Sequence, residues 1–239
     1  MSARALRARL IRQAAQGYRA SGRSSYYFAS VKLRHDPFYT LLLTEGLVPA
    51  GARIVDLGCA QALLAAWLAA AQRCYRAGYW DKSCPAPATV ASYRGIDRNE
   101  SEIRRARQAL GDAADLVVGD LGAAPLTGAT LIVMLDVLHY LDFEAQRRLL
   151  SRVRAALPAD GMLLVRVGDC AHGLRAQLSG WVDSLVLRRR GYGSGPLHRR
   201  PLAEWLLLLG ELGFTVHEVA RQQSLTYANA LLRATVQTC

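Results

Sequence analysis

The chain has 239 residues, of which 51% are hydrophobic and 21% charged, so it is long enough for one globular domain with a substantial core, and we expect no second full domain. Charged residues interrupt every apolar run before it reaches the roughly 20 residues of a membrane-spanning helix, which excludes such a span. The net charge is +11 and is concentrated in two segments. Residues 1–35 hold eight basic residues and no acid, and residues 188–200 hold five arginines. This pattern favours an acidic partner such as nucleic acid, an anionic membrane or an acidic carrier protein.

The basic start of the chain predicts an amphipathic helix, because apolar residues recur there at helical spacing with most arginines on the other face. These apolar residues are Leu6, Leu10, Ala14, Ala15 and Tyr18. A cluster of helix-breaking residues at 21–25 follows, then the aromatic residues 26–28 and a short helix around 37–46. We interpret residues 1–48 as a basic helical segment and residues 49–239 as the main domain.

Strands and helices alternate through the rest of the chain. Strands are expected at 53–57, 92–96, 116–118, 130–135, 162–167, 215–220 and 228–235, and helices at 61–77, 100–110, 142–156 and 202–212. Continuously apolar strands that alternate with helices predict an α/β fold with a mainly parallel sheet covered on both faces. Only residues 221–227 separate the last two strands, so these should form an antiparallel hairpin.

The first expected strand ends in a turn that is typical of ligand-binding sites. The sequence from Ile54 to Ala62 passes from a buried strand through Asp56 and Gly58 into a helix. Such a turn lets the backbone approach a ligand closely, and the helix N-terminus offers unpaired N–H groups. Ala60 and Ala62 stand where further glycines would be expected, so an ordinary structural turn is the alternative.

Acidic residues follow the next two expected strands as well. Asp97 ends the second strand, where a carboxylate can accept hydrogen bonds from ribose hydroxyls. Asp120 and Leu121 come just after the third strand. Any one of these acids could be a helix cap, but their positions at the ends of three strands favour one nucleoside site.

The fourth strand leads into the segment Leu135-Asp136-Val137-Leu138-His139-Tyr140-Leu141. His139 is a candidate general base, because an unperturbed imidazole pKa of about 6.5 suits proton removal from a hydroxyl. The alternative is a histidine at a helix start that serves only the backbone.

Together these motifs resemble the class I S-adenosylmethionine-dependent methyltransferases over residues 50–235. The resemblance implies a Rossmann-like three-layer sandwich, with a seven-stranded, mainly parallel sheet, one antiparallel strand and an N-terminal helical lid. It implies S-adenosyl-L-methionine as donor and S-adenosyl-L-homocysteine as product. The residues it assigns to the donor are Asp56, Gly58, Ala60, Asp97, Asp120, Leu121, Leu135 and Asp136, and it places Asp136 and His139 near the reacting methyl group.

Two basic, aromatic-containing regions should line the acceptor site, because the family covers its acceptors with the corresponding segments. The candidate residues are Tyr26, Phe28, Arg34, Tyr39, His139, Tyr140, Tyr192, His198 and Arg199. Residues 135–141 and 198–205 also resemble methyltransferases of bacterial aryl-polyene pigment biosynthesis, which implies secondary metabolism and an aromatic or phenolic acceptor, either free or bound to an acidic acyl carrier protein.

Two alternatives remain at this stage. An RNA or protein methyltransferase is less expected, because the chain lacks the Asn-Pro-Pro-Tyr type of motif and any RNA-binding module. A non-catalytic protein with the same fold is the other, because of Ala60 and Ala62. The five cysteines form no C-x-x-C pair or zinc-type spacing, and no secretory signal is apparent, so we expect free thiols, no metal site and a cytoplasmic protein.

Overall fold

The computed structural model describes residues 2–169, 196–223 and 228–237. The chain divides into two compact units, residues 1–119 and 120–239, and each is described by itself. No described helix is both long and apolar enough to cross a membrane. The boundary expected after residue 48 stays a prediction.

Unit one begins with three helices. They are α1 (Ala3–Gln16), α2 (Arg23–His35) and α3 (Phe38–Thr44), and the 3₁₀ turn η1 (Gly17–Arg19) lies between the first two. The apolar face of α1 is buried as expected, and this helix packs against α2 and α4. Ser2 caps α1 by accepting a hydrogen bond from the Ala5 N–H.

Helix α2 corrects the expectation of a breaker cluster at residues 21–25. Gly22, with φ of 98°, ends the preceding turn, and the helix starts at Arg23. Ser25, Ala29 and Leu33 follow one another at intervals of four residues and are all buried. This narrow stripe of small and apolar side chains packs on α1, and tertiary packing therefore outweighs the weak helix propensity of the serines.

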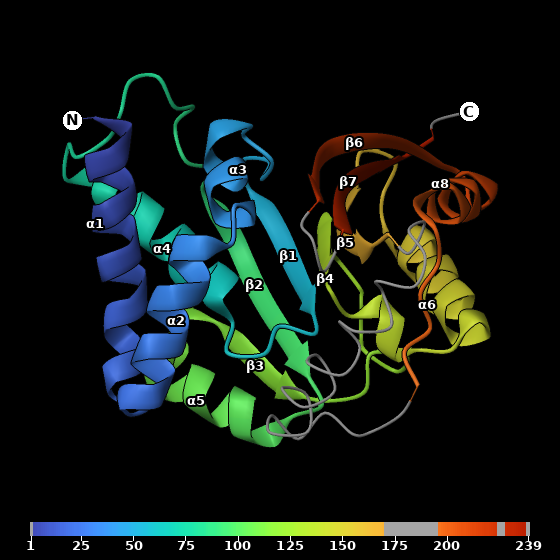
Figure 1. Cartoon of the computed structure of the whole chain (residues 1–239), viewed down its shortest axis with the longest axis horizontal. Coiled ribbons are helices and arrows are strands. Elements are labelled where there is room, and N and C mark those ends of the chain that lie inside the picture. Colours follow the sequence, from blue (N-terminus) through green and yellow to red (C-terminus); the bar gives the residue numbers. More distant parts are fainter. Residues whose placement is uncertain (1, 170–195, 224–227, 238–239) are drawn as a thin grey trace. The chain divides into compact units, whose positions relative to one another are not determined.

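The remainder of unit one is a three-stranded parallel sheet with its helices. The elements are β1 (Ala52–Leu57), α4 (Leu63–Arg76), β2 (Val90–Asp97), α5 (Glu100–Leu110), η2 (Gly111–Ala113) and β3 (Asp115–Val118). The strand order is β3-β2-β1, with all pairs parallel (Figure 1). Asn99 caps α5 by accepting hydrogen bonds from the Ser101 and Glu102 N–H groups.

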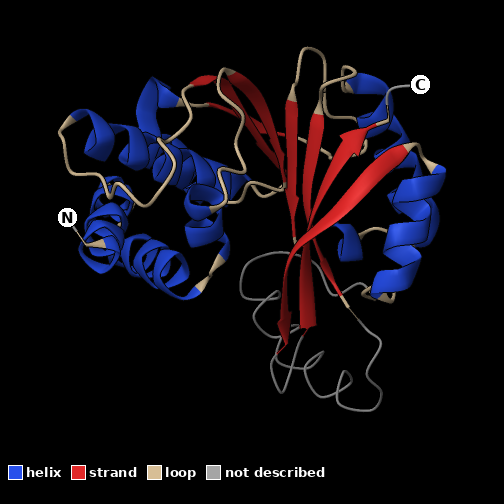
Figure 2. Ribbon diagram, turned by 90° about the horizontal axis from the view of Figure 1, so that it is seen from above, coloured by secondary structure: helices blue, strands red, loops and turns tan. Residues whose placement is uncertain are grey.

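Unit two contains four strands in the order β4-β5-β7-β6. Its elements are β4 (Leu131–Leu135), η3 (Leu138–Tyr140), α6 (Phe143–Ala156), β5 (Met162–Gly168), α8 (Leu202–Glu211), β6 (Phe214–Gln223) and β7 (Ala228–Val236). β4 and β5 are parallel, whereas β7 is antiparallel to both β5 and β6, so the expected hairpin is confirmed. Helices α6 and α8 lie on one face of these strands (Figure 2).

Candidate functional site

The turn between β1 and α4 keeps a glycine-like backbone although two of its residues are alanines. Gly58, Ala60 and Ala62 have φ angles of 80°, 47° and 53°, all in the left-handed region. For an L-residue this region costs roughly 1–2 kcal/mol, so the conformation persists only where surrounding contacts impose it.

Hydrogen bonds from two other segments, β2 and η1, hold this turn. The Gly58 N–H donates to the Ile96 carbonyl at 2.8 Å, and the Ala60 N–H donates to Asp97 Oδ2 at 2.9 Å. From the other side, the Tyr18 hydroxyl donates to the Gln61 carbonyl at 2.6 Å, and Tyr18 is fully buried. The turn is therefore fixed by partners that are distant in sequence.

Asp97 lies at the end of β2, as expected, and its carboxylate accepts hydrogen bonds from two backbone N–H groups. Its Oδ1 accepts from the Asn99 N–H at 2.8 Å while its Oδ2 accepts from Ala60, and the residue is only 3% exposed. A carboxylate oxygen can accept more than one hydrogen bond. The ribose role stays a prediction, and the structure adds a role in shaping the turn.

Burial governs the electrostatics beside the turn. It raises the pKa of Asp56 to about 7, and the nearby Asp97 adds to the shift while the Tyr93 hydroxyl, which donates to Asp56, opposes it. Burial, followed by the charges of Asp56 and Asp97, also raises the pKa of the Cys59 thiol well above its usual value. Cys59 is therefore a protonated packing residue rather than a thiolate nucleophile.

The residues of unit one fit the amino-acid end of S-adenosylmethionine. No side chain caps the N-terminus of α4, which leaves backbone N–H groups and the positive end of the helix dipole to meet a carboxylate. The Gln61 side-chain oxygen is buried in the same turn without a hydrogen-bond partner among the described residues, so it has acceptor capacity for an ammonium group.

Three predicted donor residues of unit two lie before or at the end of its first strand, β4. Asp120 and Leu121 precede this strand, and Leu135 is its last residue. Asp120 is exposed, and its Oδ1 accepts from the Gly122 N–H at 2.7 Å to form a turn. Leu121 and Leu135 are half-buried. Their contacts with adenine stay predictions.

Asp136 is a left-handed residue at the end of β4, with φ of 58°. The buried Arg166 on β5 donates two hydrogen bonds to the Asp136 carboxylate, from Nε to Oδ1 at 2.9 Å and from a terminal nitrogen to Oδ2 at 2.5 Å. This bidentate pair neutralises the carboxylate and fixes its direction. Sequence reasoning missed Arg166, although a charged residue inside an otherwise apolar strand was a visible signal.

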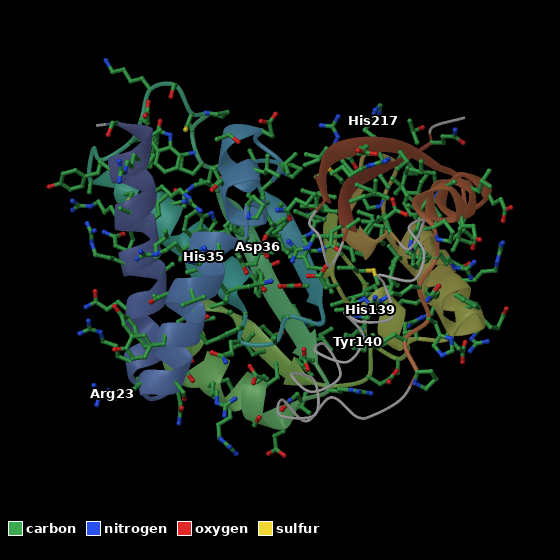
Figure 3. The ribbon with its side chains drawn as sticks, in the orientation of Figure 1. Arg23, His35, Asp36, His139, Tyr140 and His217 are labelled. Atoms are coloured by element: carbon green, nitrogen blue, oxygen red, sulfur yellow. The ribbon has the colours of Figure 1, made fainter. Side chains whose placement is uncertain are left out.

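His139 and Tyr140 lie on η3, directly after Asp136 (Figure 3), and both are half-buried. Their rings are in contact, with centroids 4.2 Å apart. The His139 carbonyl accepts from the His198 N–H at 2.9 Å. The structure thus brings His139, Tyr140 and His198 together, as the acceptor hypothesis requires.

Gln146 on α6 links η3 to residues 198–200. It is fully buried, and its Nε2 lies within 3.1 Å of the carbonyls of Leu138, Leu141 and His198. Its Oε1 accepts from Arg200 Nε at 2.8 Å. We call this arrangement the Gln146 clamp. The helical spacing of α6 gave no signal for it beyond a glutamine on the apolar face.

Arg200, which the sequence placed in the second basic region, is thus also a structural residue. Its guanidinium also lies over the Phe143 ring, 4.5 Å from the centroid. The His198 ring packs edge-on against the same Phe143 ring at 5.5 Å. Arg199 is half-buried, and Tyr192 lies outside the described residues.

The other acceptor candidates belong to the first helices of unit one. Tyr26 and Phe28 are half-buried and Arg34 is exposed on α2, whereas Tyr39 on α3 is buried against Trp67, with ring centroids 5.7 Å apart. His35 and Asp36 end α2 (Figure 3), and Asp36 pairs with Lys32 at 2.9 Å. The substrate roles of these residues stay predictions.

Comparison with models of known protein families finds no match. Over 129 residues the chain is 30% identical to carboxy-S-adenosyl-L-methionine synthase of Chromohalobacter salexigens, a match that covers 52% of this chain and 43% of that protein. The chain thus matches less than half the length of this curated relative.

Solved structures match over more of the chain. Magnesium protoporphyrin IX methyltransferase of Synechocystis with bound SAH has a TM-score of 0.57 and 20% identity, with 84% of this chain and 81% of that chain covered. An O-methyltransferase family protein of Burkholderia thailandensis has a TM-score of 0.57 and 17% identity, with 92% and 62% covered. A TehB-like methyltransferase of Corynebacterium glutamicum has a TM-score of 0.52 and 20% identity, with 83% and 86% covered. As the sequence predicted, the chain has the fold of the class I S-adenosylmethionine-dependent methyltransferases.

Proposed function

We propose that the chain is an enzyme that transfers a methyl group from S-adenosylmethionine to a small-molecule or carrier-bound acceptor. The observation that carries this proposal is the turn from Gly58 to Ala62. Its backbone keeps the left-handed geometry at three positions despite two alanines, and it leads into a helix without a side-chain cap. A fold that had lost its ligand would have no need to maintain this strain.

The donor is expected to lie with its carboxylate at the N-terminus of α4 and its ammonium group within reach of Gln61. Asp97 is proposed to accept a ribose hydroxyl while it holds Ala60. Asp120, Leu121 and Leu135 are proposed to contact the adenine. When bound, the donor supplies an electrophilic methyl group on a sulfonium, and the work of the protein is to position the acceptor and to remove its proton.

His139 is the proposed base. Arg166 already neutralises the carboxylate of Asp136, which therefore suits orientation better than proton abstraction. An imidazole can accept a proton from a phenol or similar hydroxyl near neutral pH. The Gln146 clamp fixes the backbone on both sides of His139, since it binds the carbonyls of Leu138 and Leu141.

An aromatic or phenolic acceptor is proposed because aromatic residues accompany His139. Tyr140 contacts its ring, and His198 and Phe143 lie in the segments that the clamp joins. Exposed arginines on α1 and α2, Arg4, Arg12, Arg23 and Arg34, support an acidic carrier as the vehicle of such an acceptor.

Calorimetric titration with S-adenosylhomocysteine tests the donor site without knowledge of the acceptor. We expect micromolar binding, with ATP as a control that shares the adenosine but not the amino acid. Absence of binding at millimolar ligand would contradict the proposal and favour a non-catalytic protein with this fold.

Product analysis then separates two kinds of chemistry. The curated relative is named as a synthase of carboxy-S-adenosyl-L-methionine, so the nucleoside product deserves direct inspection. Incubation with S-adenosylmethionine and a panel of phenols, free or carrier-linked, should yield S-adenosylhomocysteine by mass spectrometry. A modified S-adenosylmethionine as the product would contradict methyl transfer.

A further inference from the structure

We propose that Tyr18 is a positioning residue for the donor site, so that the N-terminal segment controls donor affinity and is not only an acceptor lid. This inference rests on the proposed function. It concerns a residue of η1 that lies 43 positions before the residue it contacts, and no donor-binding motif includes it.

The contact itself is well defined. Tyr18 is fully buried, and its hydroxyl donates to the Gln61 carbonyl at 2.6 Å. Burial raises the pKa of the Tyr18 phenol, so the hydroxyl stays protonated and remains a donor throughout the physiological range. Gln61 lies between Ala60 and Ala62, the two alanines in the left-handed region. The hydrogen bond therefore fixes the direction of the peptide group between two strained residues.

The position of Tyr18 is fixed in turn by the contact of η1 with α5. A Cβ at Gly17 would lie 2.3 Å from the Ala109 carbonyl oxygen, which shows how closely the two backbones approach. Ala109 belongs to α5, so close backbone packing against this helix sets the position of η1.

These contacts connect the residues that hold the turn from Gly58 to Ala62, which we call the donor turn. α5 follows β2, and Asp97 at the end of β2 accepts the Ala60 N–H. The turn is thus held at Ala60 by Asp97 and at Gln61 by Tyr18, while α5 connects the two holding residues. Ala60 and Ala62 have left-handed backbone angles that alanine seldom adopts without support. Loss of the hydrogen bond to Asp97 or to Tyr18 should therefore widen the range of turn conformations and weaken donor binding.

The test compares the variants Tyr18→Phe and Ser21→Ala. Tyr18→Phe keeps the buried ring and removes only the hydroxyl. Ser21→Ala, two residues after η1, removes the hydrogen bond that the Ser21 hydroxyl donates to the Arg105 carbonyl at 2.7 Å, which does not touch the turn. S-adenosylhomocysteine is titrated into each variant well below its melting temperature. We expect Tyr18→Phe to bind about fivefold more weakly, which corresponds to one net hydrogen bond, and Ser21→Ala to bind as the unaltered protein does.

Equal affinity of Tyr18→Phe and the unaltered protein would overturn the proposal. An equal loss in both variants would also overturn it, because it would indicate general loosening of η1. Rescue provides a further check: the fivefold loss should shrink when Tyr18→Phe is combined with Ala60→Gly, since glycine needs less support at positive φ.

Amide hydrogen exchange separates this proposal from the proposed function. In the ligand-free protein, Tyr18→Phe should accelerate exchange at Ala60 and Ala62, and Ser21→Ala should leave both unchanged. If the unaltered protein binds no S-adenosylhomocysteine, the proposed function fails, yet exchange still reports whether Tyr18 holds the turn. Unchanged exchange in Tyr18→Phe would overturn the positioning role itself.

Discussion

The donor turn of unit one and the Gln146 clamp of unit two solve the same problem by different means. The turn is held mainly through its own backbone groups, which meet Ile96, Asp97 and Tyr18. The clamp is one neutral side chain that gathers the carbonyls of three separate residues. The turn can therefore tolerate changes of its own side chains, although not of the Asp97 and Tyr18 side chains that hold it, whereas the clamp depends on the side chain of Gln146 itself.

The largest expected difference between the two regions is their response to pH. Burial raises the pKa of Asp56, beside the turn, to about 7 from an ordinary value of 3.8. The folded state therefore holds a proton on Asp56 that the unfolded state releases. The contribution of Asp56 to stability is greatest below about pH 4 and falls by up to about 1.4 kcal/mol per pH unit as pH rises to 7. Denaturant unfolding at several pH values should show this slope, and Asp56→Asn should flatten it.

An unchanged slope in Asp56→Asn would show that other groups carry the pH dependence. The clamp offers the contrast, because Gln146 does not titrate. A Gln146 variant should therefore shift the whole stability curve without altering its slope.

Removal of the clamp should destabilise the protein strongly. Gln146→Leu removes the side-chain donor from three carbonyl oxygens, of which Leu138 keeps the Leu141 N–H, and removes the acceptor of Arg200 Nε. We expect a loss of about 3 kcal/mol in the free energy of unfolding. Urea denaturation measures this loss. Gln108→Leu is the matched control, since Gln108 is exposed on α5 and should change stability by less than about 0.5 kcal/mol. Equal losses of stability in the two variants would show that the hydrogen bonds of Gln146 do not stabilise the protein as proposed.

Donor binding should depend on the turn and not on η3. Asp97→Ala removes the acceptor of the Ala60 N–H and, in our proposal, a ribose contact, so S-adenosylhomocysteine should bind about tenfold more weakly. His139→Ala should leave this affinity within twofold. Calorimetric titration of both variants checks the ranking, and the reverse order would contradict the placement of the ribose site.

The smallest expected effect distinguishes two left-handed residues. Ala60→Gly relieves the positive φ and should stabilise the protein by about 0.5 kcal/mol. Asp136→Gly relieves the same kind of strain but removes the carboxylate that pairs with the buried Arg166, so it should destabilise the protein. Thermal unfolding of both variants gives the two signs. A gain in both would show that strain outweighs the ion pair.

Sequence periodicity was sufficient for most of the fold because most strands are strongly apolar and several helices are amphipathic. Asn99 and Asp142 both cap the helices that follow them. α2 was missed because its helical stripe uses small residues, Ser25 and Ala29, which carry little hydrophobic signal. The antiparallel pairing of the last two strands followed from the short connection between them.

The site was predictable only where it depends on local chain geometry. Asp56, Gly58 and Asp97 could be named as candidates because strand ends and turns have recognisable residues, and their roles stay predictions. Arg166, Gln146 and Tyr18 were not, because each acts on a partner at least five positions away in the sequence, and for Tyr18 the acceptor is a backbone carbonyl that no sequence pattern reports. Long-range polar contacts of this kind require the folded structure.

The positive φ angles of Ala60 and Ala62 have a consequence for how such proteins are found. Alanine and glycine codons differ by a single base, so a turn that is held from outside can exchange one residue for the other without losing its shape. Patterns written as glycines would then pass over functional members of this fold. At this turn, backbone angles are therefore a better guide to relationship than the identities of the residues.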